Sequence, residues 1–179
     1  DYLPREECGG LSAEGAFLDC AHKLGFHVIL WVTTVGVDKH SPLVAANPQW
    51  WTHRVDGSLF CAWSSNEANG FEGYAPDAEP MSNGWRNWLK NQVKGLVDRG
   101  FDGIFVDGLI PRASNHERYD WPGQSRDAVP DQVLDLAKYL RTLRDDLLLL
   151  VEDEALQAQT GCEMTMGRYH AMAPFFYDG

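Results

Sequence analysis

The sequence is short of positive charge and of long hydrophobic runs. It has 15 Lys and Arg residues against 26 Asp and Glu, a formal net charge of −11, and its basic residues form no stripe. Proteins that bind nucleic acid neutralise phosphates with Lys and Arg, so we expect no nucleic-acid partner. No apolar run approaches the roughly 18 residues of a membrane span, and the first residues resemble no signal peptide. We expect no membrane partner, and the sequence leaves the compartment open.

Metal and cofactor motifs are also missing. The four cysteines, Cys8, Cys20, Cys61 and Cys162, contain no CxxC pair, which argues against a zinc knuckle or a redox dithiol. Free thiols and disulfides both remain open. The six histidines form no HxH or HExxH cluster, and there is no GxSxG, P-loop or GxGxxG sequence. We therefore expect neither a catalytic metal nor a cofactor.

Three passages of the chain read as a helix followed by a strand. The expected helices begin at Ser12, at Ser82 or Asn83, and near Pro130, and the expected strands cover residues 27–33, 102–107 and 147–152. The strands are continuous apolar runs, as in parallel sheets that are covered on both faces. This pattern predicts an α/β fold with a parallel sheet, and no linker divides residues 1–179, so we expect one domain.

Two helices have apolar residues at helical spacing. In the middle helix these are Trp85, Trp88, Leu89, Val93 and Leu96, which we expect to be buried against the sheet. In the first helix they are Phe17, Cys20, Ala21 and Leu24. The joins "KLGFHVIL" and "DRGFDGIF" repeat one device, in which a helix ends at Gly and Phe leads into the strand.

Two of the expected strands end in acidic residues. Asp107 ends "IFVDG" and Glu152 ends "LLLLVE", with Glu154 two residues further on. Neighbouring strands lie about 4.8 Å apart, so carboxyls at matching tips can approach the roughly 5 to 5.5 Å separation found in retaining glycosidases. The alternative is structural: Asp107 caps the following loop, and the "EDE" run is a solvated turn.

The long segments after the strands are rich in aromatic residues. Trp50, Trp51 and Trp121 offer flat apolar faces on which a sugar ring can stack. Trp31 lies inside a strand and can face either the core or a pocket. His116 is a candidate hydrogen-bonding residue for a substrate. Each of these has an ordinary alternative, as a packing residue or a solvated side chain.

The residues also resemble a known family. "AHKLGFHVILWVTTVGVDKHSPLVAANPQWWTHRVDG", "WLKNQVKGLVDRGFDGIFVDG" and "LLLLVEDEAL" are similar to the middle of a glycoside hydrolase (β/α)8 barrel of the α-galactosidase and α-amylase type. The resemblance implies that Asp107 is the nucleophile and Glu152 the acid/base, with Glu154 and Asp178 as alternatives for the second role. It further implies a carbohydrate substrate and no cofactor. Trp31 and Glu154 are further candidates for contact with that substrate.

The chain is short for such a fold, since a complete barrel takes about 250 residues. We therefore expect a partial (β/α) barrel, about half of one. Such a chain either belongs to a longer protein or associates with the remaining barrel portion or with itself. The functional prediction is a retaining glycoside hydrolase, and the alternative is a non-catalytic carbohydrate-binding or assembly protein. Sugar, linkage and anomeric preference are not specified by the sequence.

Overall fold

The protein forms two compact units. The computed structural model describes residues 2–34, 36–38, 40–53, 56–60, 63–64, 74–75, 78–107, 125–152 and 164–165. Unit 1 comprises residues 1–32, 90–107 and 134–179, and unit 2 comprises residues 33–89 and 108–133. Two long helices, α3 (Asn83–Arg99) and α4 (Ser125–Leu143), contribute residues to both units.

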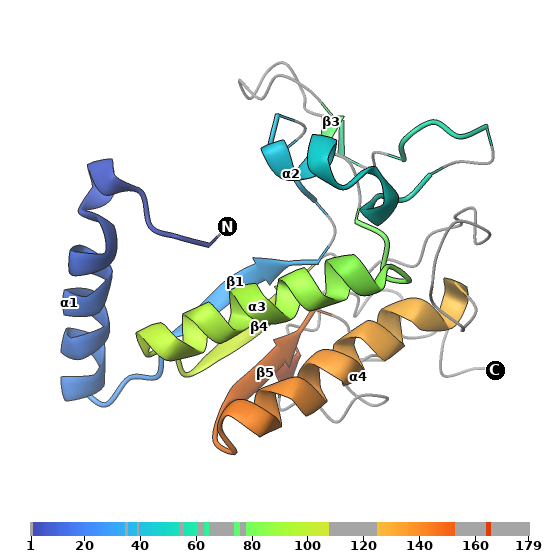
Figure 1. Ribbon diagram of the computed structural model, residues 1–179. Coiled ribbons are helices and arrows are strands. Elements are labelled where there is room, and N and C mark those ends of the chain that lie inside the picture. The colour runs from blue at the N-terminus through green and yellow to red at the C-terminus, as the bar shows by residue number, and fades with distance from the viewer. Residues whose placement is uncertain are drawn as a thin grey trace. The chain divides into compact units, whose positions relative to one another are not determined.

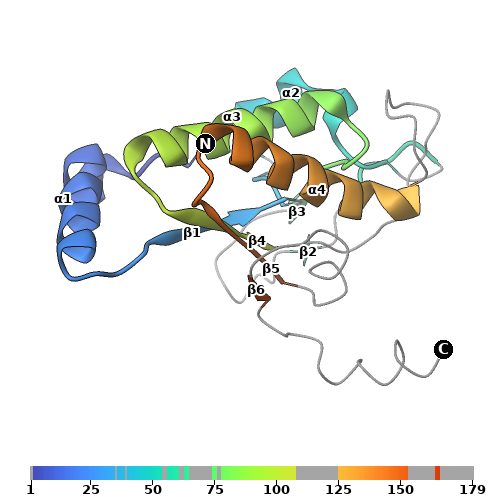
Figure 2. The ribbon, with the colours of Figure 1, turned by 90° about the horizontal axis from the view of Figure 1, so that it is seen from below.

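A four-stranded sheet is the centre of unit 1; Figure 1 shows β1, β4 and β5, and Figure 2 also shows β6. Its order is β1 (Ile29–Thr33), β4 (Gly103–Asp107), β5 (Leu148–Val151) and β6 (Met164–Thr165). The pairs β4/β5 and β5/β6 are parallel. The sequence-based prediction of a parallel α/β sheet is thus confirmed, and the three predicted strands begin and end within two residues of the observed ones.

One face of the two central strands, β4 and β5, is fully buried. Ile104 and Val106 of β4 are 0% exposed, and Leu149 and Val151, their registered partners on β5, are 2% and 0% exposed. In both views the second halves of α3 and α4 lie side by side along the sheet (Figures 1 and 2). An ion pair of 2.7 Å between Lys90 Nζ and Asp135 Oδ2 joins the two helices.

Helix α3 forms as the pattern predicts. Its N-terminus is capped by Ser82, whose Oγ accepts the backbone N–H of Trp85 at 3.3 Å. It ends at Gly100, whose φ of +105° belongs to the left-handed region that glycine tolerates. The predicted stripe is buried at Trp85, Leu89, Val93 and Leu96, while Trp88 is partly buried.

Two features of the other helices differ from expectation. Helix α1 (Gly10–Lys23) buries Leu18, but of the four residues at helical spacing Phe17, Cys20 and Leu24 are exposed, and only Ala21 is half-buried. In Figures 1 and 2, α1 lies to one side and does not cover the sheet face on which α3 and α4 pack. Helix α4 begins five residues before the predicted start, and Pro130 lies inside it.

The smaller elements are short. Unit 2 holds α2 (Pro42–Ala46), a 3-10 turn η2 (Pro48–Trp50) and the antiparallel pair β2 (Trp63–Ser64) and β3 (Tyr74–Ala75). Unit 1 begins with the 3-10 turn η1 (Glu6–Cys8). No helix within the described parts of the chain has the length and apolarity needed to cross a membrane.

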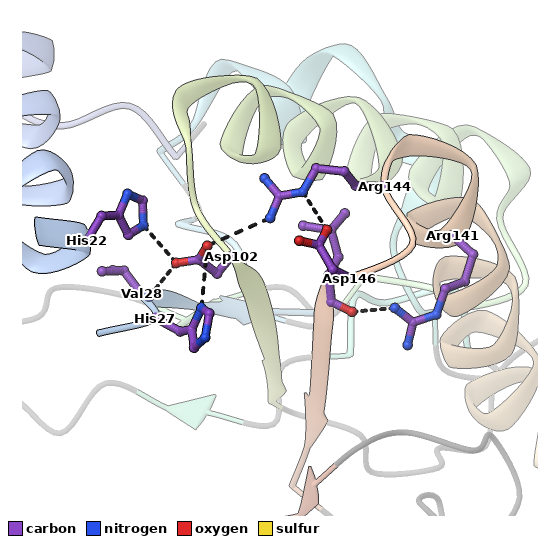
Figure 3. Close-up of polar contacts among 8 residues, drawn as sticks. His22, His27, Val28, Asp102, Arg141, Arg144 and Asp146 are labelled. Carbon is purple, nitrogen blue, oxygen red and sulfur yellow. Dashed lines mark hydrogen bonds and ion pairs between the residues drawn. The ribbon is translucent and has the colours of Figure 1, made fainter. Parts of the chain in front are cut away.

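A polar network joins four segments at the N-terminal ends of the strands (Figure 3). Asp102, just before β4, accepts hydrogen bonds of 2.8 Å from His22 Nε2 and from the Val28 backbone N–H. His27 Nδ1 and an Arg144 nitrogen each lie 3.7 Å from the other carboxylate oxygen. The network ties α1 and the segment after α4 to the start of the sheet.

Candidate active site

Asp107 is the last residue of β4 and lies at the opposite end of the strand from Asp102. Side chains alternate along a strand, so Asp107 shares a face with Phe105, while Ile104 and Val106 occupy the buried, helix-covered face. Asp107 is half-buried. Its carboxylate therefore points away from the helices, to the face that forms the interior of a (β/α) barrel.

The register of β4 and β5 sets Glu152 beside Asp107. Registered pairs run from Gly103 with Leu148 to Val106 with Val151, and the next residues along are Asp107 and Glu152. Adjacent strands lie about 4.8 Å apart, the scale at which two carboxyls can serve one reacting bond. The expectation that the two acids share the C-terminal edge of the sheet is confirmed.

The two acids have different environments. Asp107 is half-buried, whereas Glu152 is 3% exposed. Removal of water penalises a charged carboxylate far more than a neutral carboxylic acid. The edge thus presents one half-buried acid and one that is almost fully buried.

Trp31 reaches this edge from β1, the other neighbour of β4. Its indole Nε1–H donates a hydrogen bond of 2.9 Å to Asp107 Oδ2, and the residue is 51% exposed. At the other end of the strands, the Asp102 N–H donates to Val28 O at 2.9 Å. One contact joins the residues just before the two strands, and the other joins residues near their C-terminal ends. β1 therefore runs in the same direction as β4. Trp31 thus faces the side of the sheet that carries Asp107.

Trp50 and Trp51 lie in unit 2 and pack in an aromatic cluster. Trp51 is 1% exposed, its indole N–H donates to Val44 O at 3.0 Å, and its ring centroid lies 5.9 Å from that of Trp85. Trp51 is therefore a core residue with no ring face left for a sugar, contrary to its expected stacking role. Trp50 is partly buried and so close to Gly84 that a methyl group there would strike its ring.

The remaining predicted site residues lie outside the described residues. These are His116, Trp121, Glu154 and the alternative acid Asp178. Within the described ranges, no group of three or more His, Cys, Asp or Glu side chains is placed to hold a metal ion. The described site therefore consists of Asp107, Glu152 and Trp31.

Sequence reasoning missed the network at Asp102, although a signal for it exists. His27 and Asp102 occupy the same place in the repeated "GFH" and "GFD" joins, one residue after the Phe. Equivalent positions of neighbouring helix-strand units come together at the N-terminal edge of a parallel sheet. The approach of His27 Nδ1 to Asp102 Oδ1, at 3.7 Å, is the result.

Comparison with known proteins gives a family and a set of similar structures. The profile described as "GHL15: Hypothetical glycosyl hydrolase family 15" matches residues 33–171. No curated protein sequence matches the chain.

Three solved structures illustrate the fold. An α-N-acetylgalactosaminidase from Bifidobacterium bifidum, in its GalNAc complex, is similar with a TM-score of 0.73 at 14% identity, over 96% of this chain and 26% of that one. An α-amylase from Lactobacillus plantarum has a TM-score of 0.68 at 18% identity, over 93% and 38%. An α-galactosidase from Thermus thermophilus, bound to stachyose, has a TM-score of 0.62 at 16% identity, over 92% and 33%.

These similarities establish the fold as part of a glycosidase barrel. The chain spans only 26% to 38% of the length of these three structures, while they cover nearly all of it. A partial (β/α) barrel, as the sequence predicts, is therefore the observed fold class.

Proposed function

Because the chain belongs to the family described as hypothetical glycosyl hydrolase family 15, we propose that it carries the catalytic centre of a retaining glycoside hydrolase. In this proposal Asp107 is the nucleophile and Glu152 is the general acid/base. The supporting observation is the register of β4 and β5, which makes Asp107 and Glu152 the next pair after Val106 and Val151. The reaction needs no cofactor.

The proposed chemistry has two steps. In the first, an Asp107 oxygen bonds to the anomeric carbon while the glycosidic C–O bond breaks, and the departing oxygen takes a proton from Glu152. In the second, Glu152 removes a proton from water as that water attacks the anomeric carbon, and Asp107 leaves as a carboxylate. The screened position of Glu152 suits a group that must begin the cycle protonated.

The sugar itself requires further contacts. We propose that Trp31, through its exposed ring, contributes to sugar binding, and that His116, Trp121, Glu154 and Trp50 remain candidates for the same role. The proposed substrate class is an O-glycoside of a carbohydrate. The three similar structures are an α-N-acetylgalactosaminidase, an α-amylase and an α-galactosidase, so the proposal assigns no single sugar.

The test is a panel of chromogenic aryl glycosides with three variants. The assays use the full-length polypeptide that carries this sequence, because the chain spans at most 38% of the structures compared above. We expect Asp107→Asn to remove turnover on every substrate while the free energy of unfolding changes by less than about 1 kcal/mol, since the amide keeps the shape but forms no glycosyl ester. Asp145→Asn, exposed before β5, is the matched control and should retain wild-type rates.

Glu152→Gln separates the two roles. Fluoride ion departs from a glycosyl fluoride without a proton from the enzyme. This variant should therefore still carry out the first step on glycosyl fluorides but lose activity on ordinary glycosides. Equal loss of the first step on both substrates, measured as the initial burst of released leaving group, would assign Glu152 another role and return Glu154 and Asp178 to consideration as the acid. Wild-type rates in Asp107→Asn would show that Asp107 only caps a loop.

The alternative function is a non-catalytic carbohydrate-binding or assembly protein. It predicts saturable sugar binding by the wild type, with no turnover of any glycoside in the panel. Calorimetric titration with the sugars that correspond to the panel distinguishes this outcome from an enzyme whose substrate was absent. In the latter case neither turnover nor binding is seen with the panel sugars.

A further inference from the structure

We propose that Trp31 is a positioning residue: its indole N–H holds Oδ2 of Asp107 and so orients the carboxylate that attacks the sugar. The proposal rests on the proposed glycosidase function and adds to it what orients the nucleophile. The contact that supports it is the 2.9 Å hydrogen bond from Trp31 Nε1 to Asp107 Oδ2.

The fold gives this hydrogen bond a fixed frame. Trp31 lies in β1 and Asp107 in β4, and these strands are neighbours in the sheet. Both residues are held by strand backbone, so neither end of the hydrogen bond lies on a loop. An indole has a single N–H donor and two side-chain torsions, so it can hold one oxygen in one direction. Glu152 directly follows β5, which is the neighbour of β4 on the other side.

The hydrogen bond has unequal effects on the two chemical steps. A donor stabilises an ionised acceptor more than a neutral one, because charge-assisted hydrogen bonds are roughly twice as strong. In the first step Asp107 loses its charge on forming the ester, so Trp31 contributes orientation but not electrostatic assistance. In the second step the ester oxygen departs as a carboxylate, Oδ2 regains negative charge, and the same N–H stabilises the leaving group.

This asymmetry gives a specific kinetic expectation for Trp31→Phe, which keeps a ring and removes the donor. A hydrogen bond to a charged group contributes about 1.5 to 3 kcal/mol, so breakdown of the glycosyl-enzyme should slow by about tenfold to a hundredfold. The ester should therefore accumulate and appear in the intact mass of the protein during turnover. Hydrolysis of the glycosyl-enzyme then limits turnover in Trp31→Phe. Both kcat and KM should therefore fall, because most of the enzyme is held as the ester. Trp88→Phe, the same substitution on α3, is the matched control.

A second measurement tests the contact without any activity. In protein with 15N-labelled tryptophan, the Trp31 indole resonance is identified by its loss in Trp31→Phe. Its chemical shift should change in Asp107→Asn, which alters the acceptor of this hydrogen bond, and should stay as in the wild type in Glu152→Gln. The Trp51 indole, which donates to the Val44 carbonyl, serves as an internal reference because neither substitution alters its acceptor.

The outcomes separate the two proposals. A Trp31 resonance that ignores Asp107→Asn overturns the positioning role and leaves the nucleophile assignment intact. The same conclusion follows if the resonance responds but Trp31→Phe keeps wild-type kcat and accumulates no ester. If the resonance responds and the wild-type protein binds the panel sugars without turnover, the glycosidase function fails, and the positioning role fails with it. A responsive resonance together with a trapped ester in Trp31→Phe supports both.

Discussion

Gly103, at the start of β4, has no room for a side chain. A Cβ at this position would strike the backbone carbonyl of Leu148 and come within 2.9 Å of that residue's own Cβ. Neither neighbour is the free end of a flexible chain, so the strands would have to move apart. Gly103 therefore sets how closely β4 approaches β5, and with it the spacing of the two acids at the other end.

We predict that Gly103→Ala lowers the free energy of unfolding by about 1 to 3 kcal/mol, the usual cost of overpacking. Gly15→Ala is the matched control: it lies within helix α1, where a methyl group would have no atom within 4 Å, and alanine there should stabilise by about 0.5 to 1 kcal/mol. Urea unfolding followed by circular dichroism measures both. Two substitutions with the same small effect would show that the β4/β5 contact is not tight.

Asp102 makes the free energy of unfolding depend on pH in the acidic range. Burial alone would raise the pKa of this carboxyl, but the Val28 N–H and the hydrogen bond and charge of His22, with that of His27, together lower its pKa below the ordinary value of 3.8. A carboxyl whose pKa is lowered by folding stabilises the protein above its unfolded pKa. That stabilisation disappears as the pH falls through the lower, folded value.

We therefore predict that Asp102→Asn destabilises the protein at pH 7 by about 1 to 3 kcal/mol through the lost charged hydrogen bonds. The difference from wild type should shrink as the pH falls below about 3.8, where the unfolded chain takes up the proton that the folded state resists. Asp145→Asn, exposed in the turn before β5, should show no such pH dependence. Parallel curves for Asp102→Asn and wild type over the whole pH range would contradict this explanation.

At the residue scale, sequence reasoning located the acids but not their contacts. The positions of Asp107 and Glu152 follow from where apolar runs stop, which a sequence displays directly. The bond from Trp31 to Asp107 depends on which strand is the neighbour of β4, and chain order does not contain that information. Trp51 was assigned to sugar stacking because it lies in a loop-like segment, and its burial arises from contacts with Val44 and Trp85 that the local sequence does not reveal.

At the scale of single elements, α3 and α1 differ in how far their apolar residues are buried. Both carry apolar residues at helical spacing, yet the α3 stripe is buried and the Phe17 and Leu24 side chains of α1 are exposed. Periodicity identifies a face that a helix can bury. It does not show whether a partner for that face is present. The burial predicted for the α3 stripe is therefore confirmed at Trp85, Leu89, Val93 and Leu96, while α1, for which only the spacing is noted, leaves Phe17 and Leu24 exposed.

We predict a corresponding difference in stability. Trp85→Ala should cost about 3 to 5 kcal/mol, because Trp85 is 1% exposed and its ring lies between those of Trp51 and Trp88. Phe17→Ala, at a position that is 59% exposed, should change the free energy of unfolding by no more than about 0.5 kcal/mol. Chemical denaturation compares the two. A cost at Phe17 near that at Trp85 would show that α1 packs against a partner in solution.

At the scale of the whole molecule, the exposed large apolar side chains are concentrated near the start of the described chain. Five large apolar residues within the first 26 are between 53% and 69% exposed: Leu3, Leu11, Phe17, Leu24 and Phe26. An apolar surface of this kind commonly marks a site of association. We expect the 179-residue chain to associate with itself through this segment.

Sedimentation velocity over a range of concentrations tests this expectation. The wild-type chain should show a concentration-dependent increase in sedimentation coefficient, and Phe17→Ser together with Leu24→Ser should reduce it. Exchange of Leu18, which is 3% exposed, is unsuitable because it would disturb the interior of the unit instead. A chain that remains monomeric at every concentration would contradict self-association through α1.

The overall architecture was largely predictable because helix-strand alternation and continuous apolar strands both point to a parallel α/β fold. The extent of the barrel was predicted from chain length alone and agrees with the coverage of the similar structures. The expectation of one domain over residues 1–179 stays a prediction. The division into two units separates the strand cores from the long segments that follow them, and no sequence pattern marks that boundary, because α3 and α4 run through it without a break.

The register of β4 and β5 also determines where the chain tolerates inserted or deleted residues. Side chains alternate along a strand, so inserting one residue between Gly103 and Val106 would turn Asp107 to the helix side and bring a different residue opposite Glu152. A one-residue insertion in the exposed turn at Asp145 and Asp146 leaves that alternation intact. Length variants of natural or designed relatives that keep their activity should therefore carry their insertions in the turns, with these two strands unchanged in length.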